Sequence, residues 1–334
     1  MLVIHDAYDA GALPRGGIAA IGNFDGVHRG QRAVLERITA RAAATGLTPM
    51  VVTFEPHPLA VLRPEEAPPR LTSAEHKEEL LAAAGIEVAL VVAFTVEFSR
   101  TPAEAFVREF LHGGLGLREI YVGTGFVFGH RREGDLALLS RLGAELGFEA
   151  CEVEQVGWRG ERISSTRVRR AVAEGRVDEA AAMLGRPHSI RGTIARGDRM
   201  GQRLGWPTAN LDTEGELVPH EGVYATRSRF DEAEFDSVTN IGTRPTVYEN
   251  YRRVVESHIL GFAGDAYDRA VELFFYKRLR EERIFPTVMD LSAQIGRDVE
   301  ATREFFTARR RLGESGSNGP SLSQDSSSRT HTTR

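Results

Sequence analysis

The hydrophobic pattern of this chain changes at Arg186-Pro187, and this change limits the fold more than any other feature. Before it, short apolar segments alternate with stretches of helical period, as buried parallel strands joined by helices do. The apolar segments are residues 18–21, 50–54, 88–94, 119–122 and 151–156. We therefore expect residues 1–185 to form a doubly wound, Rossmann-like α/β domain.

The helices of this domain carry their own start and stop signals. Val34, Leu35, Ile38 and Ala42 recur at helical spacing, and Gly46 is placed to end that helix. Residues 164–166, Ser-Ser-Thr, are expected to open a later helix, and residues 177–184 predict one more, closed by Gly185.

Beyond Pro187 the pattern is that of an all-β domain. The predicted strands are residues 188–196, 222–230, 235–242, 253–261 and 269–278, separated by Gly, Pro, Asp or Asn. Such spacing favours a small barrel or sandwich, and a closing helix is expected over residues 287–309. We assign residues 186–310 to this barrel domain. Residues 311–334, rich in Ser, Thr and Gly, are expected to form a disordered tail.

Composition excludes several classes of protein. A net charge of -5 argues against a general nucleic-acid coat. The single Cys151 cannot form an internal disulfide, so a reducing, cytoplasmic setting is expected. The sequence has no signal-like N-terminus and no run of 18 apolar residues. We expect small-molecule substrates and no membrane or nucleic-acid partner, and we leave oligomerisation open.

Residues 22–31, Gly-Asn-Phe-Asp-Gly-Val-His-Arg-Gly-Gln, follow a predicted strand and open a helix. This is where α/β proteins bind phosphates, because glycines allow close approach and the helix N-terminus attracts anions. His28 could donate to a phosphate and stabilise charge at a reacting phosphorus. A structural histidine in a turn is the alternative. The segment lacks the Gly-x-x-x-x-Gly-Lys pattern of a Walker loop.

Three further clusters fit the same pocket. His57 and Pro58 end a strand and could contact a flat ring, or simply form a turn. Phe126 and Phe128 follow another strand and could stack on an aromatic ligand, or pack inward. Residues 162–169 place arginines at a helix start, where polyphosphate contact competes with ordinary capping and solvation.

In the second domain, residues 201–210 read Gly-Gln-Arg-Leu-Gly-Trp-Pro-Thr-Ala-Asn. Gly201 and Gly205 can take positive φ and let backbone N–H groups approach a ligand. On an extended chain Thr208 and Asn210 share one face, and their oxygens suit Mg²⁺ with its phosphates. A plain Gly/Pro turn is the other interpretation.

Taken together, these motifs closely resemble the bacterial bifunctional riboflavin kinase/FAD synthetase family over about residues 15–308. The resemblance also includes Leu-Gly-Arg-Pro at 184–187, Gly-Val-Tyr at 222–224, Asn-Ile-Gly-Thr-Arg-Pro-Thr at 240–246 and Val-Glu-Ser-His at 255–258. It implies a nucleotidyltransferase-type domain that makes FAD from FMN and ATP, releasing pyrophosphate. It also implies a flavokinase barrel that makes FMN from riboflavin and ATP, both with Mg²⁺.

The resemblance further implies roles for individual residues. Glu256 would accept the proton of the ribityl hydroxyl, and Thr208 with Asn210 would hold the metal. Without the resemblance, Glu256 is better interpreted as an ordinary exposed glutamate on a strand face with Val254, His258 and Leu260. His28 would act in adenylyl transfer. The remaining predicted ATP contacts are Gly22, Phe24, Asp25, Gly30, Gln31, Arg162, Ser165, Thr166, Arg169, Gly201, Gly205 and Thr208. The predicted flavin contacts are His57, Pro58, Phe128, Asn210, Gly222 and Tyr224.

The chain departs from the family pattern at three places. Gln31 stands where the family has a second histidine, Gly125 where it has Asp or Asn, and Gln202 where it has an arginine that Arg203 could partly replace. We therefore hypothesise a functional kinase and a slowed or lost FAD synthesis. The alternative is a kinase whose N-terminal domain only senses nucleotide or flavin. A nucleic-acid-binding regulator is a third hypothesis, opposed by the acidic net charge.

Overall fold

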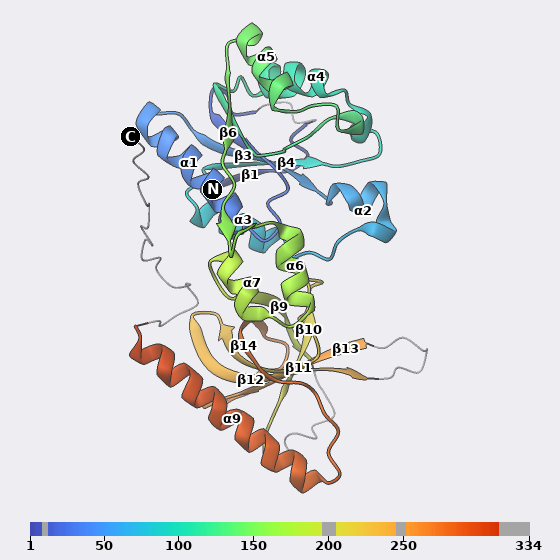
Figure 1. The fold of residues 1–334 in the computed structure, drawn as a ribbon, viewed down its shortest axis with the longest axis vertical. Coiled ribbons are helices and arrows are strands. Elements are labelled where there is room, and N and C mark those ends of the chain that lie inside the picture. The colour runs from blue at the N-terminus through green and yellow to red at the C-terminus, as the bar shows by residue number, and fades with distance from the viewer. Residues whose placement is uncertain (9–12, 196–204, 245–251, 314–334) are drawn as a thin grey trace, which may run out of the picture.

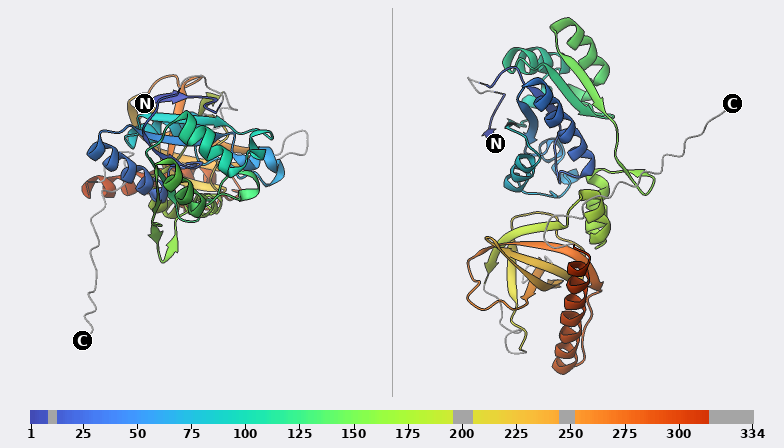
Figure 2. Two further views of the ribbon diagram at one scale, coloured as in Figure 1. Left: turned by 90° about the horizontal axis from the view of Figure 1, so that it is seen from above. Right: turned by 90° about the vertical axis from the view of Figure 1, so that its left-hand side faces the viewer.

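The computed structural model describes residues 1–8, 13–195, 205–244 and 252–313. A parallel α/β domain and a β-barrel lie at opposite ends of the molecule (Figure 1). Two helices, α6 (Ser165–Ala173) and α7 (Val177–Leu184), lie between them. The side view in Figure 2 shows the same separation.

The α/β domain is built on a six-stranded sheet of order β1-β4-β3-β2-β5-β6, with all neighbouring strands parallel. The strands are β1 (Leu2–Ile4), β2 (Ile18–Ile21), β3 (Pro49–Glu55), β4 (Val88–Ala93), β5 (Glu119–Gly123) and β6 (Glu149–Val153). A short hairpin follows, formed by β7 (Gly157–Trp158) and β8 (Glu161–Arg162).

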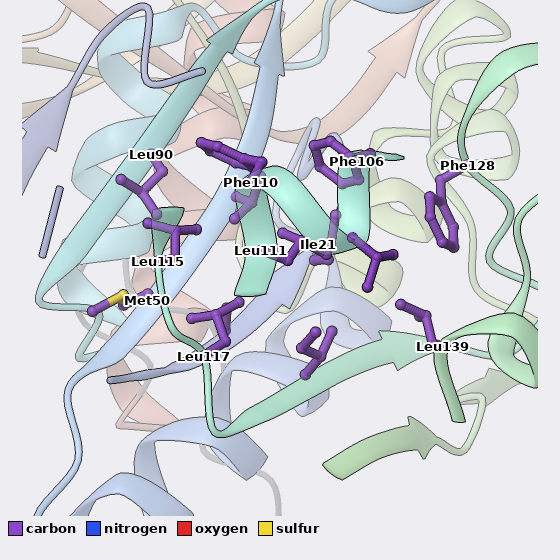
Figure 3. Packing of buried hydrophobic residues seen from close by; sticks show 14 of the residues in the cluster. Ile21, Met50, Leu90, Phe106, Phe110, Leu111, Leu115, Leu117, Phe128 and Leu139 are labelled. Atoms are coloured by element: carbon purple, nitrogen blue, oxygen red, sulfur yellow. The ribbon is translucent and has the colours of Figure 1, made fainter. Parts of the chain in front are cut away.

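Helices cover both faces of the sheet, because its strands are apolar on both sides. On one face, α1 packs Leu35 and Ile38 against Ile18. On the other, Phe106 and Phe110 belong to the larger buried cluster drawn in Figure 3. The helices of the domain are α1 (Arg29–Thr45), α2 (Pro58–Leu62), α3 (Ala74–Ala83), α4 (Ala103–Ala105), the π-helical η3 (Phe106–Gly114) and α5 (Leu136–Leu146). Three single 3₁₀ turns are η1 (Pro64–Glu66), η2 (Phe98–Arg100) and η4 (His130–Arg132).

The second domain is a closed antiparallel barrel of order β10-β13-β12-β11-β14-β9. Its strands are β9 (His188–Ala195), β10 (Ala209–Thr213), β11 (Gly222–Phe230), β12 (Ala233–Arg244), β13 (Arg252–Ile259) and β14 (Ala270–Arg280). The final helix, α9 (Val288–Arg311), packs Val299 against Val223 and Val238 on the outer side of the barrel.

The barrel interior combines an apolar core with a chain of buried hydroxyl groups. The apolar part includes Leu211, Ile241 and Val255. The hydroxyl groups lie on β11, β12 and β13 and bond one another at 2.7–3.0 Å. They belong to Thr226, Ser228, Ser237, Thr239 and Ser257, each at most 4% exposed. The interior is therefore packed, and ligand-accessible positions lie on the outer face of the strands.

The two domains also meet through charged side chains. Arg191 on β9 donates to Glu79 of α3 at 2.8 Å and to Glu272 of β14 at 3.3 Å. Glu272 is 6% exposed and also accepts from Ser189 at 2.7 Å. His76 of α3 places Nε2 3.7 Å from the same carboxylate. These contacts tie α3 to the barrel wall.

The predicted architecture is confirmed, including the burial of the helix marked by Val34, Leu35, Ile38 and Ala42 and its end at Gly46. Four strands of the structure were not predicted: β1, β10, and the two-residue strands β7 and β8 of the hairpin. β1 has only three residues, and β10 contains Asn210 and Asp212, which have low β-propensity. The predicted strand 151–156 begins earlier, at Glu149, and ends earlier, at Val153. α9 extends to Arg311, and residues 314–334 of the predicted tail lie outside the described part of the chain.

None of the described helices is long and apolar enough to cross a membrane.

Candidate functional sites

The first candidate site lies at the carboxyl edge of the parallel sheet, where β2 neighbours both β3 and β5. The chain leaves β2 through α1 toward one side and reaches β5 on the other, so this is a topological switch point. Such points are where open α/β sheets bind ligands. The loop of residues 22–28 follows β2, and the loop of residues 124–129 follows the adjacent β5.

His28 occupies the N-cap of α1, and its side chain is held by a reciprocal pair of hydrogen bonds. The Gln31 N–H donates to Nδ1 of His28 at 3.2 Å, and the His28 N–H donates to Oε1 of Gln31 at 3.1 Å. A Cβ on Gly30 would lie 3.2 Å from the His28 ring, so glycine leaves room for this arrangement. Gln31 therefore has a capping role that the sequence did not reveal.

Burial sets the protonation state of His28, and the hydrogen bond at Nδ1 sets its tautomer. Burial lowers its pKa to about 4, against the opposing effect of a backbone hydrogen bond and helped by the Arg162 charge, so the ring is neutral at pH 7. Because Nδ1 accepts a hydrogen bond, the ring proton is on Nε2. His28 can therefore act as a neutral N–H donor at the start of a helix, toward an anion.

Asp25 has a structural role in the loop. Its carboxylate accepts from the Leu71 N–H at 3.0 Å, from the Thr72 N–H at 3.2 Å and from Arg169 at 2.5 Å. The residue is 8% exposed. Ser165 of α6 donates to the Asp25 carbonyl at 2.9 Å. These bonds connect the loop to α6 and engage both oxygens of the Asp25 carboxylate within the protein.

Other predicted residues of this site are brought to the same edge. The amide of Asn23 lies 3.3 Å from Nε2 of His57, so His57 and the adjacent Pro58 border the loop. Arg169 is engaged by Asp25 and by the Pro69 carbonyl at 2.9 Å. Arg162 and Thr166 are exposed near the start of α6. Gly22 and Phe24 belong to the loop itself, where Phe24 is 3% exposed.

The loop after β5 differs from the expectation for Phe128. This side chain is 8% exposed and packs against Phe106 and Phe126, with ring centroids 6.1 and 5.7 Å away. It belongs to the core, so the structure supports packing in place of the predicted flavin contact. Gly125 has φ of +75°, and a Cβ there would meet no atom within 4 Å.

Three buried histidines give a testable pH dependence. Burial lowers the pKa of His28 to about 4, of His76 to about 3 and of His188 to about 4. Between pH 6.5 and about 4 the unfolded chain binds protons that the folded chain does not. The free energy of unfolding should therefore fall on acidification through this window, by about 1.4 kcal/mol per histidine per pH unit.

Urea denaturation at pH 7.5, 6.5 and 5.5 measures this slope. In a His76→Gln variant, the slope of the unfolding free energy against pH should be smaller by the contribution of one histidine. An unfolding free energy that stays constant down to pH 5 would contradict the burial of these rings in their neutral form.

The second candidate site lies on the outer face of the barrel, where three strands align polar residues. Asn210 of β10 pairs directly with Glu256 of β13, and Glu256 pairs on its other side with Asn240 of β12. Their neighbours Ala209 and Val255 point into the barrel core, so the polar residues point outward. Directly paired side chains have Cβ atoms about 4.5–5.5 Å apart. Thr208 precedes this row by two residues on the β10 side.

Aromatic and helical contacts hold the segment before Thr208. Trp206 donates from Nε1 to the Ser292 hydroxyl of α9 at 3.0 Å and meets the His258 ring edge-on at 5.5 Å. Nδ1 of His258 lies 2.7 Å from the carbonyl oxygen of Pro207, within hydrogen-bonding distance. Gly205, with φ of +82°, turns the chain into this segment. The start of α9 therefore fixes the turn that presents Thr208.

Two predicted flavin contacts lie elsewhere. Tyr224 is fully buried inside the barrel, packs edge-on against Phe275 at 5.5 Å and donates to the His220 carbonyl. Gly222 is buried, and a Cβ there would approach Arg278 to 2.8 Å. Tyr224 therefore has a packing role in place of the predicted contact, and the predicted contact of Gly222 stays a prediction. Gly201, with Gln202 and Arg203, lies outside the described residues.

Asn240 is a residue of this site that the sequence did not indicate. The Asn-Ile-Gly-Thr-Arg-Pro-Thr motif that contains it contributes to the family resemblance but assigns Asn240 no role. Its position beside Glu256 depends on the register of β12 and β13. A strand register of this kind cannot be read from a segment alone.

The oxygen donors of the barrel site fit a magnesium ion that is bound mainly through phosphates and water. In the part of the chain that the structure describes, no group of three or more His, Cys, Asp or Glu is placed to hold a metal. Asn210 offers an amide oxygen on β10, and Thr208 offers a hydroxyl just before this strand begins. Mg²⁺ keeps several waters and needs only one or two protein ligands beside substrate phosphates.

Comparison with protein families divides the chain in the same way. The model described as FAD synthetase matches residues 11–167, and the model described as riboflavin kinase matches residues 184–306. The first match ends within α6 and the second begins at the last residue of α7, so the boundary between them lies in the two helices that join the domains.

Full-length relatives agree with both matches. The bifunctional riboflavin kinase/FMN adenylyltransferase of Escherichia coli K12 is 38% identical over 92% of this chain and 98% of its own. The bifunctional riboflavin kinase/FMN adenylyltransferase of Pseudomonas fluorescens is 40% identical over 86% of this chain and 93% of its own. A crystal structure described as a macrolide-efflux protein from Streptococcus pneumoniae superposes with a TM-score of 0.83 at 26% identity, covering 90% of this chain and 98% of that one. The chain belongs to the bifunctional riboflavin kinase/FMN adenylyltransferase family.

Proposed function

We propose that the two family activities are performed at the two sites described above. The barrel phosphorylates riboflavin to FMN at the row formed by Asn210, Glu256 and Asn240. The α/β domain transfers AMP from ATP to FMN at the loop that ends in His28. The alignment of Asn210 with Glu256 across β10 and β13 is the observation that supports the kinase site most strongly.

In the kinase reaction, Glu256 accepts the proton of the ribityl hydroxyl as its oxygen bonds to the γ-phosphorus of ATP and ADP leaves. Asn210 and Thr208 would hold Mg²⁺, which neutralises charge on the phosphates. Because Glu256 stands directly opposite Asn210, the base and the phosphate-binding side chains approach the same reacting atoms. Asn240 borders Glu256 from the other strand and would limit the orientations of its carboxylate.

In adenylyl transfer, an FMN phosphate oxygen bonds to the α-phosphorus of ATP, and pyrophosphate leaves. Nε2–H of His28 would donate to a phosphate oxygen as negative charge develops there. The neutral ring provides this contact without a proton exchange at neutral pH. The start of α1 adds its backbone N–H groups and helix dipole. This domain would also need Mg²⁺, for which the described residues offer no dedicated group of ligands.

A two-step assay tests both halves of the proposal. Riboflavin, ATP and Mg²⁺ are supplied and the flavins are separated over time, and FMN with ATP is supplied in a second reaction. Pyrophosphate release together with FAD supports adenylylation. Binding of FMN and ATP without pyrophosphate release would instead support a sensing domain.

We expect Gln31→His to change the adenylylation rate. If a second imidazole is what limits this site, the substitution should raise the rate about ten- to hundredfold, since one charge-assisted contact contributes about 1.5–3 kcal/mol. The capping bond from the His28 N–H to Gln31 Oε1 opposes this gain, because the new side chain must replace it.

Gly125→Asn serves as the matched comparison. Its φ of +75° suits asparagine after glycine, and no atom stands in the way. If Gly125→Asn raises the adenylylation rate and Gln31→His does not, the residue that limits this rate relative to the family pattern lies in the loop after β5. Kinase rates should be unchanged in both variants.

A further inference from the structure

Arg186 connects the kinase half of the chain to the phosphate loop of the other half. It lies between α7 and β9, inside the riboflavin kinase match. Its guanidinium nevertheless donates from Nη2 to the Gly26 carbonyl at 2.9 Å, with a longer contact from Nη1 to the Val27 carbonyl at 3.5 Å. These two carbonyls precede His28 directly.

The loop before His28 needs such support because its backbone is strained. Phe24 and Val27 have φ of +49° and +39°, which is uncommon for residues with side chains, and Gly26 has φ of +85°. The Asp25 carboxylate and the Gly26 N–H are held by Leu71, Thr72 and Arg169. The carbonyls of Gly26 and Val27 are held by Arg186.

The charge of Arg186 also faces this loop. Among the residues that the structure describes, no carboxylate lies within 4 Å of its guanidinium, and its buried Nε has no hydrogen-bond partner. Burial lowers the pKa of Arg186 to about 10, so the group remains cationic at neutral pH. A partly buried cation behind a helix N-terminus stabilises an anion bound in front of it.

We propose that Arg186 is a positioning residue for adenylyl transfer, supplied across the domain boundary by the kinase half. Its planar fork fixes the Gly26 and Val27 carbonyls, so that His28 and the amides at the start of α1 face the ATP phosphates. This inference rests on the function proposed for the α/β domain. It adds that the flavokinase segment contains part of the adenylyltransferase machinery.

The test compares three full-length variants with the wild type. Arg186→Met removes the fork and the charge, and Arg186→Lys keeps the charge without the fork. Arg191→Met is the matched control, because it removes contacts to Glu79 and Glu272 across the same junction without touching the loop. FAD formation from FMN and FMN formation from riboflavin are measured on the same preparations, with kcat and KM for ATP separated.

We expect Arg186→Met to lower kcat for adenylylation about tenfold to a hundredfold, with kinase kcat unchanged. Arg186→Lys should retain part of the adenylylation kcat that Arg186→Met loses, and Arg191→Met should change this kcat little. Equal losses of both activities, or equal effects of Arg186→Met and Arg191→Met, would overturn the proposal in favour of general domain packing. If Arg186→Met fails to fold, Arg186→Lys with an intact adenylylation rate would overturn it as well. Wild-type protein that makes no FAD from FMN would instead remove the proposed adenylyltransferase function on which the inference rests.

Discussion

Glu256→Gln is expected to lower riboflavin phosphorylation by about 10²- to 10⁴-fold, the range that a positioned general base contributes. The amide has the same shape as the carboxylate but cannot accept the hydroxyl proton. Since Glu256 lies in the middle of the strand row, the substitution should disturb neither the barrel core nor the pairing of β10 and β13. The initial rate of FMN formation from riboflavin measures the effect.

FAD formation from supplied FMN serves as the internal control for this variant, because that reaction would take place in the other domain. Glu300→Gln changes an exposed glutamate of α9 and should leave both rates unaltered. A Glu256→Gln enzyme that still phosphorylates riboflavin at the wild-type rate would mean that another group takes the proton. The role of Glu256 would then be limited to orienting its neighbours.

His28→Asn should have the opposite selectivity. Asparagine is among the best N-cap residues, so α1 keeps its cap while the Nε2–H donor is lost. Losing a hydrogen bond to a charged phosphate costs about 1.5–3 kcal/mol, and adenylylation should slow about ten- to hundredfold. Pyrophosphate release from FMN and ATP measures this loss, and riboflavin phosphorylation should be unchanged.

The pH dependence of the rate gives a second test of the same residue. With a pKa of about 4, His28 does not titrate between pH 6 and 8. The pH–rate profiles of the wild type and of His28→Asn should therefore have the same shape in this range, with no acidic limb due to His28. Such a limb near pH 6.5 would show that the ring becomes cationic in the working enzyme. His5→Asn, a change at a histidine with a 65% exposed side chain, is the control.

The fold could be predicted well from the sequence because local patterns determine it. Leu35 and Ile38 lie at helical spacing, and strands buried on both faces are continuous apolar runs. The loop with His28 could be located for the same reason, since it lies between a predicted strand and a predicted helix. These signals are contained in a few neighbouring residues.

The roles of particular side chains in the sites depended on tertiary contacts that are absent from the local pattern. Asp25 resembles a ligand contact in sequence, but its partners Leu71 and Arg169 are distant in the chain. Tyr224 lies on β11, which is buried by the barrel core on one face and by α9 on the other. Polar and apolar residues therefore do not alternate along this strand in a way that shows which face the Tyr224 side chain is on. The position of Asn240 beside Glu256 required the strand register.

The buried hydroxyl chain of the barrel links strand alignment to the row of residues proposed for the kinase reaction. Thr239 and Ser257 bond each other at 3.0 Å in the interior, and their immediate neighbours Asn240 and Glu256 face outward. If β12 slipped by one residue against β13, these buried hydroxyl groups would lose their partners, and Asn240 would no longer lie opposite Glu256. The interior hydrogen bonds therefore disfavour misaligned barrels, and the same bonds keep Asn240 opposite Glu256 in the proposed kinase row.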